Sequence, residues 1–279
     1  MAFTIATWNI EGRLCYYDGG KNRGTPETIL AEIKRLNADV VVLPEVYLNA
    51  PANGVDDQLK AMGYSWYDTQ YHDTLHDEVI KRWGHHFIRV LYRLPLVKAK
   101  TQRWGDIRDL PLITLQDPET KKEVVIIATH LDDLTEERRL TQVSEIIEYI
   151  KTSDSPIIML GDFNAMWHEG WRRVLTGRFM RWVTTTMPSR TLRDVLSRFS
   201  RMATGKVMVR LRAAGMHDAD PHHRATTTPK MRGMAWMPSI RLAQIDHILV
   251  RKGVRASKVI IGKDHGSDHR SLTCKITIQ

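Results

Sequence analysis

A short apolar run followed by a glycine and two polar residues lies at positions 156–165, with the sequence PIIMLGDFNA. The run follows a break rich in Ser and Asp, which predicts a buried strand. Asp162 and Asn164 come on alternate positions at its end, so both can emerge on the same side. A carboxylate and an amide held in this way suit the activation of water for phosphate-ester chemistry. An Asx-rich turn that closes a core strand is the competing interpretation, and the rest of the chain must decide.

Polar residues accompany other short apolar runs in the same manner. Strands are predicted at 3–8, 39–43, 87–92, 110–116, 123–129, 243–250, 258–261 and 271–278. At or near the ends of these runs stand Asn9, Glu11, Glu45, His130, Asp246, Asp268 and His269. Glu45 follows a Val/Leu strand after Pro44, and is either a solvated loop residue or a ligand.

Three helices are expected in the first 150 residues. Thr25 as N-cap and Pro26 at the first helical position predict a helix that runs through Leu36. A short helix is expected at about 56–62, and a longer one at about 136–150 with apolar residues at helical spacing. The chain has no internal repeat, low-complexity tract or clear linker. A single domain over residues 1–279 is therefore expected.

The composition excludes several classes of protein. Hydrophobic residues make up 42% of the chain, enough for a sizeable core, but no apolar run approaches the ~18 residues of a membrane span. Cys15 and Cys274 are too few and too far apart for a disulfide framework or a zinc site, so two free thiols are expected. The first residues lack the features of a signal peptide. We expect a cytoplasmic protein, with a processed secreted chain as the alternative.

The net charge of +9 originates in one segment. Between positions 172 and 212, eleven Arg or Lys stand against a single acid, Asp194. A helix is expected there, beginning at Ser189 or Thr191 and ending near Thr204. Its apolar stripe leaves four arginines on other faces: Arg190, Arg193, Arg198 and Arg201. They form either an ordinary solvated surface or a surface that binds anions.

The polar residues at the strand ends predict a metal site. Strand ends of a sandwich of two sheets can share one rim, so that residues far apart in sequence can line one pocket. Their side chains offer oxygen ligands without cysteine, and such a set favours Mg²⁺ or Mn²⁺ over zinc.

Six motifs resemble those of the endonuclease/exonuclease/phosphatase superfamily, whose members share the DNase I-like fold. They are TWNIEG, LPEV, ATHLDD, LGDFNA, QIDHILV and GSDHRSL, in the family's order over nearly the whole chain. The resemblance implies an α/β fold of four layers, α/β/β/α, in which two mostly antiparallel sheets pack face to face with helices outside. It also implies a metal-dependent phosphodiester hydrolase.

The resemblance assigns a ligand set to the metal. Asn9, Glu45 and Asp268 match the family's divalent-metal shell, and Glu11 matches an outer contributor. The family usually has Gln before the metal-binding Glu, where this chain has Pro44. This departure changes a neighbour of the ligand and leaves the ligand itself in place.

The resemblance also assigns catalytic roles. Asp162 would orient or deprotonate the attacking water, and Asn164 would hydrogen-bond a phosphate oxygen. His269, oriented by Asp246, would stabilise the phosphoryl group as negative charge builds on it. His130 would contact the phosphate or the leaving oxygen.

Two features separate this chain from parts of the family. Apurinic-site endonucleases have a Tyr where His130 falls, and His resembles instead the DNase I, deadenylase, sphingomyelinase and tyrosyl-DNA phosphodiesterase branches. The opening TWNIEG is nearest to the last of these. A basic helical insert at about 167–213 is longer than the family's usual connection after GDFNA. The function of no characterised branch can therefore be carried over directly to this chain.

A nuclease that hydrolyses phosphodiester bonds in DNA is the leading hypothesis, because the basic insert can steer phosphates. The alternatives are a lipid or small-molecule phosphodiesterase at an anionic membrane surface, and an enzyme similar to tyrosyl-DNA phosphodiesterase. A non-catalytic binding module is disfavoured because each expected catalytic position is filled. A monomer is expected, and no protein partner can be inferred.

Overall fold

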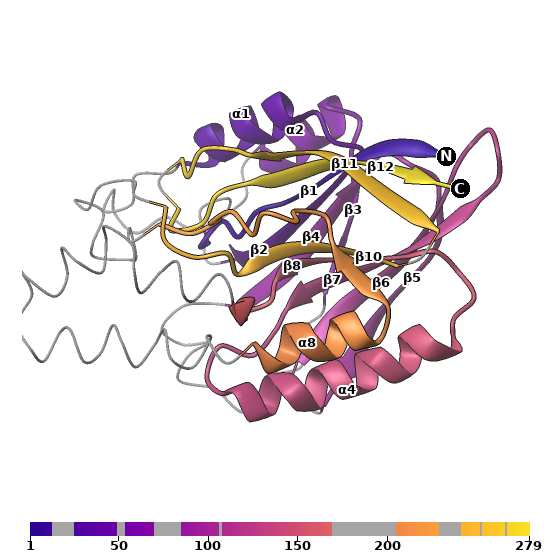
Figure 1. Cartoon of the computed structure of the whole chain (residues 1–279). Coiled ribbons are helices and arrows are strands. Elements are labelled where there is room, and N and C mark those ends of the chain that lie inside the picture. Colours follow the sequence, from indigo (N-terminus) through magenta and orange to yellow (C-terminus); the bar gives the residue numbers. More distant parts are fainter. Residues whose placement is uncertain are drawn as a thin grey trace, which may run out of the picture.

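The computed structural model describes residues 1–12, 25–48, 54–69, 85–105, 108–168, 205–228, 241–251, 253–265 and 267–279. Its strands form two sheets that pack face to face, and helices cover the outer face of each sheet (Figure 1). The α/β/β/α sandwich expected from the sequence is thus confirmed.

The first sheet has six strands in the order β11-β12-β1-β2-β4-β3. They are β1 (Ala2–Thr7), β2 (Val40–Leu48), β3 (Ser65–Asp68), β4 (His85–Tyr92), β11 (Val254–Ile261) and β12 (Leu272–Ile278). Strands β1 and β2 are parallel, while the other neighbours are antiparallel.

The second sheet also has six strands, in the order β5-β6-β7-β8-β10-β9. They are β5 (Leu96–Trp104), β6 (Arg108–Gln116), β7 (Glu123–His130), β8 (Ile157–Asp162), β9 (Met216–Asp218) and β10 (Asp246–Arg251). Only β7 and β8 are parallel neighbours among these strands. Both sheets are therefore mostly antiparallel, as predicted.

The helices lie in two outer layers. Helices α1 (Pro26–Leu36) and α2 (Val55–Ala61) cover the first sheet, and α4 (Glu136–Thr152) and α8 (Lys206–Ala213) cover the second (Figure 1). The side chain of Thr25 accepts a hydrogen bond from the Thr28 amide at the start of α1, and Thr135 caps α4 in the same way. These caps satisfy backbone donors that the first helical turn leaves without partners.

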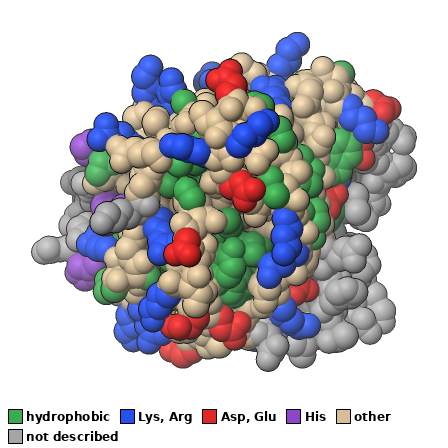
Figure 2. Space-filling model, turned by 90° about the vertical axis from the view of Figure 1, so that its right-hand side faces the viewer, with side chains coloured by type: hydrophobic (Ala, Val, Ile, Leu, Met, Phe, Trp, Pro, Cys, Tyr) green, Lys and Arg blue, Asp and Glu red, His purple; other side chains and the backbone are tan. Residues whose placement is uncertain are grey.

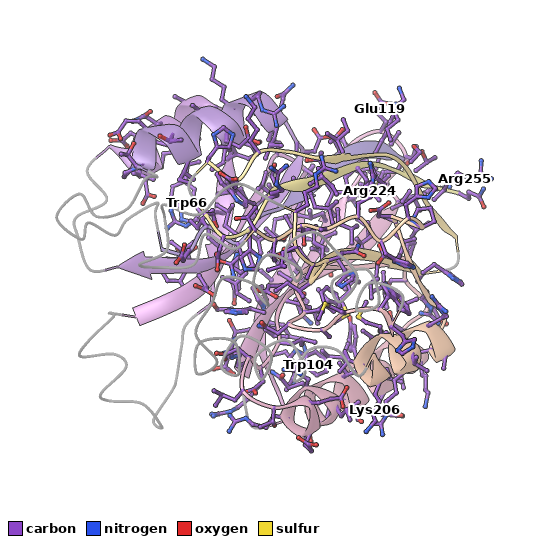
Figure 3. The ribbon with its side chains drawn as sticks, turned by 60° about the vertical axis from the view of Figure 1, so that its left-hand side comes forward. Trp66, Trp104, Glu119, Lys206, Arg224 and Arg255 are labelled. Carbon is purple, nitrogen blue, oxygen red and sulfur yellow. The ribbon has the colours of Figure 1, made fainter. Side chains whose placement is uncertain are left out.

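Two apolar cores hold the layers together. The larger lies between the sheets and continues beneath α4 and α8, and it includes Ile5, Ile127 and Val143. The smaller lies between the first sheet and α1 and α2, where Ile33 and Trp8 are fully buried. In the larger core, Trp104 (labelled in Figure 3) packs edge-on against Tyr149 of α4, with ring centroids 6.0 Å apart.

Several elements differ from the sequence-based expectation. Strands β3, β5 and β9 and helix α8 were not predicted, because β5 is half-exposed without clear alternation and the others are short. Such elements depend on pairing with a neighbour more than on their own pattern. Strand β2 continues through Glu45 to Leu48, so the prediction that Glu45 lies beyond the strand is wrong. The helix expected near 189–204 lies outside the described residues.

The surface at the end where the termini lie has mixed charge. Figure 2 shows Lys and Arg interspersed there with Asp, Glu and apolar side chains, without a patch of one sign among the residues drawn in colour. No helix in the described part of the chain is long and apolar enough to span a membrane. Cys274 is buried in the core, which raises the pKa of its thiol to about 12, and Cys15 lies outside the described residues.

A buried polar cluster beside β10 is centred on Asp218. Its Oδ2 accepts a hydrogen bond from the indole Nε1 of Trp167 at 2.8 Å and lies 2.8 Å from Nδ1 of His247. Burial by itself raises the pKa of the Asp218 carboxyl. The imidazoles of His223, at 3.8 Å, and His247 outweigh that effect and hold the pKa well below its usual range. The cluster joins β9 to β10 and to the segment that follows β8.

Replacement of Asp218 by Asn is expected to lower the free energy of unfolding at pH 7 by about 3 kcal/mol, because it removes a charged acceptor from buried hydrogen bonds. The folded-state pKa of Asp218 is depressed, so its contribution is present above the usual value of about 4 and is lost as the pH falls below it. The difference between parent and variant should therefore shrink toward acid pH. Urea unfolding across this range measures it, and Asp154→Asn at an exposed site is the control. An equal loss at all pH values would contradict the pairing.

Candidate active site

Three strand ends of the second sheet bring polar side chains into one row. His130 lies opposite Asp162 in the parallel pair β7 and β8. Asp246 lies opposite Asp162 in the antiparallel pair β8 and β10. Because β10 begins where β7 and β8 end, the three residues lie side by side at one end of the sandwich.

Gly161 permits the close approach of β7 and β8 just before this row. Its backbone φ of +143° is rare in residues that have a side chain. In addition, a Cβ atom at this position would lie 1.9 Å from the carbonyl oxygen of Thr129. No real Cβ contact is that short, so only glycine fits without movement of the backbone. The glycine thus fixes the spacing between His130 and Asp162.

Replacement of Gly161 by Ala is expected to destabilise the fold by about 3 kcal/mol or more, since backbone strain adds to a clash in a packed core. Gly215 offers a matched control, because its φ is also positive, at +85°, but no atom lies within 4 Å of a Cβ built there. Gly215→Ala should cost only the conformational strain of about 1–2 kcal/mol. Thermal or urea unfolding measures both. An equal loss of stability in Gly161→Ala and Gly215→Ala would show that the contact with Thr129 is unimportant.

The first sheet contributes Asn9 and Glu45 to the same rim. Glu45 has a φ of +56°, and the register between β2 and β4 shifts between Leu43 and Val46. This bulge redirects the side chain of a residue inside a strand. The amide Nδ2 of Asn9 donates to Oε1 of Glu45 and to Oδ2 of Asp162, at 3.0 Å each. Asn9 therefore links the two sheets across the site.

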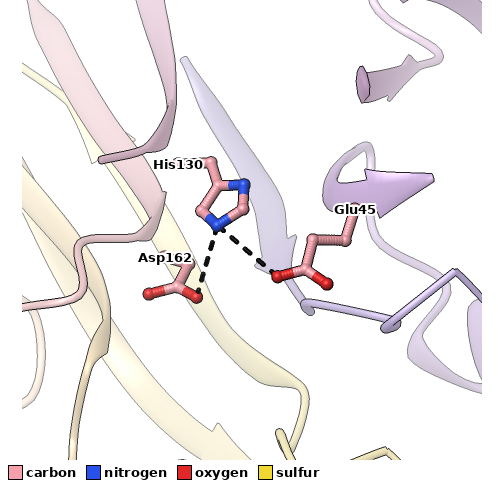
Figure 4. A group of neighbouring side chains, drawn as sticks. All are labelled: Glu45, His130 and Asp162. Atoms are coloured by element: carbon pink, nitrogen blue, oxygen red, sulfur yellow. Dashed lines mark ion pairs between the residues drawn. The ribbon is translucent and has the colours of Figure 1, made fainter. Parts of the chain in front are cut away.

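His130 stands between the two carboxylates that Asn9 contacts. Its Nε2 lies 3.5 Å from Oε1 of Glu45 and 4.0 Å from Oδ2 of Asp162 (Figure 4). These distances allow electrostatic attraction but exceed an ordinary hydrogen bond. Burial raises the pKa of Glu45, and the hydrogen bond from Asn9 opposes this rise only in part. The Glu45 side chain is still 23% exposed.

His269 is held by Asp246 and faces two further carboxylates. Its Nδ1 lies 2.8 Å from Oδ2 of Asp246, while its Nε2 lies 3.8 Å from both Asp162 Oδ2 and Asp268 Oδ1. Burial by itself lowers the pKa of His269. The negative charges of Asp246 and Asp268 outweigh burial and raise the pKa well above its usual value. These carboxylates therefore favour the protonated form of the buried imidazole.

Asp162 is placed to accept a proton. Burial raises its pKa to about 7, although the charge of His269 opposes the shift. Its Oδ1 accepts a hydrogen bond from the backbone amide of Asn164 at 2.8 Å, and the Asn164 side-chain amide donates to the carbonyl of Leu131 at 3.0 Å. A carboxylate with a pKa near neutrality can act as a base at physiological pH.

The residues that the sequence predicts for metal binding and for catalysis lie together at this rim in the structure. They are Asn9, Glu11, Glu45, His130, Asp162, Asn164, Asp246, Asp268 and His269, joined by the contacts described above and by the hydrogen bond from the Glu11 amide to Asn9 Oδ1. The predicted nucleic-acid-binding residues Arg190, Arg193, Arg198 and Arg201 lie outside the described residues.

Sequence reasoning missed three residues that support the cluster. Ser267 Oγ donates to the Asn9 carbonyl at 2.8 Å and accepts from the His269 amide at 3.1 Å. The Trp8 indole donates to the His269 carbonyl, and the Thr226 hydroxyl accepts from the Asp246 amide. Ser267 and Trp8 fall inside the quoted motifs, which was an available signal. Thr226 lies 20 residues before Asp246 in sequence, and no local pattern marks it.

The donor set fits a divalent metal. Glu45, His130 and Asp162 each place one ligand atom within 4.8 Å of the others. The neutral Asn9 amide is a hydrogen-bond donor shared by the carboxylates of Glu45 and Asp162, and a cation in the same place would attract both carboxylates more strongly. The ligand atoms of a second group, Asp162, Asp246 and His269, lie equally close together, but there Nδ1 of His269 already pairs with Asp246 at 2.8 Å. The Glu45 side of the site is thus the better place for a metal.

Solved structures of low sequence identity share this fold. One is an endonuclease/exonuclease/phosphatase from Beutenbergia cavernae, with a TM-score of 0.66 and 20% identity over 99% of this chain and 72% of that chain. D. rerio TDP2 complexed with single strand DNA product has a TM-score of 0.62 and 16% identity, over 99% of each chain. The catalytic domain of human Nocturnin with bound sulfate anion has a TM-score of 0.62 and 17% identity, over 100% and 95%.

Sequence comparison identifies the family directly. No curated protein has a sequence that matches this chain. Residues 6–269 match the Endonuclease/Exonuclease/phosphatase family, and this range includes each residue of the cluster. With nearly the whole sequence matched and the fold shared, the chain belongs to the Endonuclease/Exonuclease/phosphatase family.

Proposed function

We propose that this protein hydrolyses phosphodiester bonds with a divalent metal ion, and that its substrate is nucleic acid, most simply DNA. One observation carries the proposal. A buried imidazole cation, His269, is fixed by Asp246 and faces Asp162, a carboxylate whose pKa suits a base. A cation beside a base is the arrangement needed to bring water to an anionic phosphate.

In the proposed reaction, Asp162 takes a proton from water as the water oxygen forms a bond to phosphorus. The bond from phosphorus to the leaving oxygen then breaks, and the leaving oxygen takes up a proton from solvent water. His269 donates a hydrogen bond from Nε2 to the phosphoryl oxygens, which gain negative charge in the transition state. Asn164 binds a phosphate oxygen, and His130 contacts the phosphate or the leaving oxygen.

The metal would be Mg²⁺ or Mn²⁺, held by Asn9, Glu45 and Asp268 with Glu11 nearby, which is the set that the family resemblance implies. Of these residues, Glu45 also belongs to the group with His130 and Asp162 whose ligand atoms lie close together. A bound divalent ion supplies positive charge next to the phosphate and makes water more acidic. For Asn9 to serve as a ligand, its side-chain oxygen would have to leave the Glu11 amide and replace the NH₂ group that now contacts Glu45 and Asp162.

Nucleic acid is preferred as substrate for two reasons. The segment 172–212 is strongly basic, and Lys206, Arg210 and Arg212 of that segment lie on α8. Among the structural neighbours, D. rerio TDP2 is complexed with a single strand DNA product, and ANGEL2 is described as a 2′,3′-cyclic phosphatase in complex with adenosine-2′,3′-vanadate. The latter structure has a TM-score of 0.64 and 15% identity.

An activity screen tests the proposed function. The protein, supplied with Mg²⁺ or Mn²⁺, is incubated with single- and double-stranded DNA, RNA, abasic DNA, 5′-tyrosyl DNA and a lipid phosphodiester. Asp162→Asn serves as the inactive control. Turnover of DNA that the control lacks supports the proposal. Turnover of the lipid and of no nucleic acid would contradict the proposal and favour a lipid phosphodiesterase that acts at a membrane surface.

The basic insert should act in binding more than in chemistry. Replacement of Arg190, Arg193, Arg198 and Arg201 by Gln is expected to raise KM or Kd for DNA and leave kcat nearly intact. Each phosphate contact that is lost flattens the dependence of log K on log salt by about 0.9 on a duplex, so four contacts give about 3–4. Titrations at several salt concentrations measure this slope. Equal slopes in variant and parent would contradict a phosphate-binding role, and lost vesicle binding with unchanged DNA affinity would favour the membrane alternative.

A further inference from the structure

A buried carboxylate lies outside the active-site cluster, on the outer helix α1. The Glu32 side chain is fully buried, next to apolar positions that hold Ile29 and Ile33. Its two oxygens accept hydrogen bonds from Arg35 Nε and Nη2, at 2.6 and 2.7 Å. They also accept from Ser271 Oγ and His265 Nε2, at 3.0 Å each. Burial opposes ionisation, but the hydrogen bonds from Arg35 and Ser271 outweigh it and lower the pKa of Glu32.

A helix that only packs on a sheet does not need a carboxylate on its inner face. Burial of a charge costs several kcal/mol and is repaid only through good hydrogen bonds, so an apolar residue would serve packing as well or better. What Glu32 contacts is therefore informative. Two of its partners, His265 and Ser271, belong to the loop between β11 and β12, which also carries Asp268 and His269.

Contacts within the loop connect these anchors to the site. The Gly262 amide donates to the Ser271 carbonyl at 2.8 Å, which closes the base of the loop. The His265 ring packs edge-on against Trp8, with centroids 5.8 Å apart, and the Trp8 indole donates to the carbonyl of His269. Glu32 thus holds the loop at His265 and at Ser271, on either side of Asp268 and His269 in sequence.

We infer that Glu32 is a positioning residue, which fixes the loop carrying Asp268 and His269 from the outer helix. The inference rests on the proposed function in so far as those two residues take part in the reaction. Loss of the carboxylate should loosen the loop and misplace the His269 imidazole without changing how the substrate is bound elsewhere.

Hydrogen exchange of the metal-free protein, combined with steady-state kinetics, tests this role. Glu32→Gln should speed exchange at the amides of Gly262, Ser267 and His269 by about tenfold, the factor for one lost hydrogen bond to a charged group. The kcat should fall by about tenfold, which is the smaller of the losses typical when a residue that orients a site is replaced. The KM should be unchanged. Glu27→Gln, at an exposed position of the same helix, is the matched control.

Ser271→Ala removes one donor and leaves Glu32 its other partners, so it carries the same test if Glu32→Gln does not fold. Faster exchange confined to the loop, together with reduced kcat, supports the inference. Unchanged loop exchange, faster exchange throughout both sheets, or a loosened loop with parental kcat would each overturn it. If the parent cleaves no phosphodiester, the proposed function fails, while localised exchange would still show that Glu32 anchors the loop.

Discussion

Replacement of His269 by Ala is expected to lower kcat by about 10²–10³-fold and to change KM little, as for the loss of a donor that acts in the transition state. The reason lies in its surroundings. The imidazole is buried, is held by Asp246 at 2.8 Å and carries a proton because the neighbouring carboxylates raise its pKa. A fixed positive charge gains most when the phosphoryl oxygens become more negative, which happens after the substrate is bound.

Asp246→Asn separates the role of the pair from that of the imidazole alone. It should lower kcat by about 10- to 100-fold, less than His269→Ala, because it alters the orientation and charge of a group that is still present. His217→Ala provides a control at an exposed histidine. Steady-state kinetics on the best substrate measure all three variants. An Asp246→Asn enzyme with parental kcat would mean that the orienting pair has no part in the reaction.

The fold could be predicted where the sequence carries strong local signals. The cap at Thr25, the apolar faces of α1 and α4 and the Val/Ile-rich strands of the core all appear where the pattern indicates. Strand β5 could not be found in this way, because its residues are half-exposed and its stability comes from pairing with β6. The pairing of distant strands likewise needs tertiary contacts that no local pattern records.

The candidate site could be predicted in its residues but not in its geometry. Polar residues at or near the ends of apolar runs indicated Asp162, His130, Asp246 and His269, and the resemblance to a family supplied the role of each. The bulge that aims Glu45 depends on a register shift against β4, which is a property of two strands together. The buried Glu32 carries no sequence signal either, since an acid on a helix is usually exposed.

Removal of divalent metal is expected to reduce turnover by about three orders of magnitude or more, because a bound ion contributes several kcal/mol of charge stabilisation in the transition state. The carboxylates themselves support this expectation. Glu45 and Asp162 share the Asn9 amide at 3.0 Å from each, and a bound divalent ion would offset the charge of these two carboxylates more strongly than a neutral amide does. Exhaustive chelation followed by addition of Mg²⁺ or Mn²⁺ should abolish and then restore activity.

The variant Glu45→Gln tests whether the dependence on divalent metal involves the Glu45 carboxylate. The variant should need about 10- to 100-fold more metal for half-maximal activity, since it loses a charged ligand and keeps its shape. Glu119→Gln, in the exposed turn between β6 and β7 (Figure 3), should need the same metal concentration as the parent. Binding of Mn²⁺ to the protein without substrate provides a readout independent of turnover. Full activity after chelation would contradict metal dependence, and parental metal affinity in Glu45→Gln would place the ion away from Glu45.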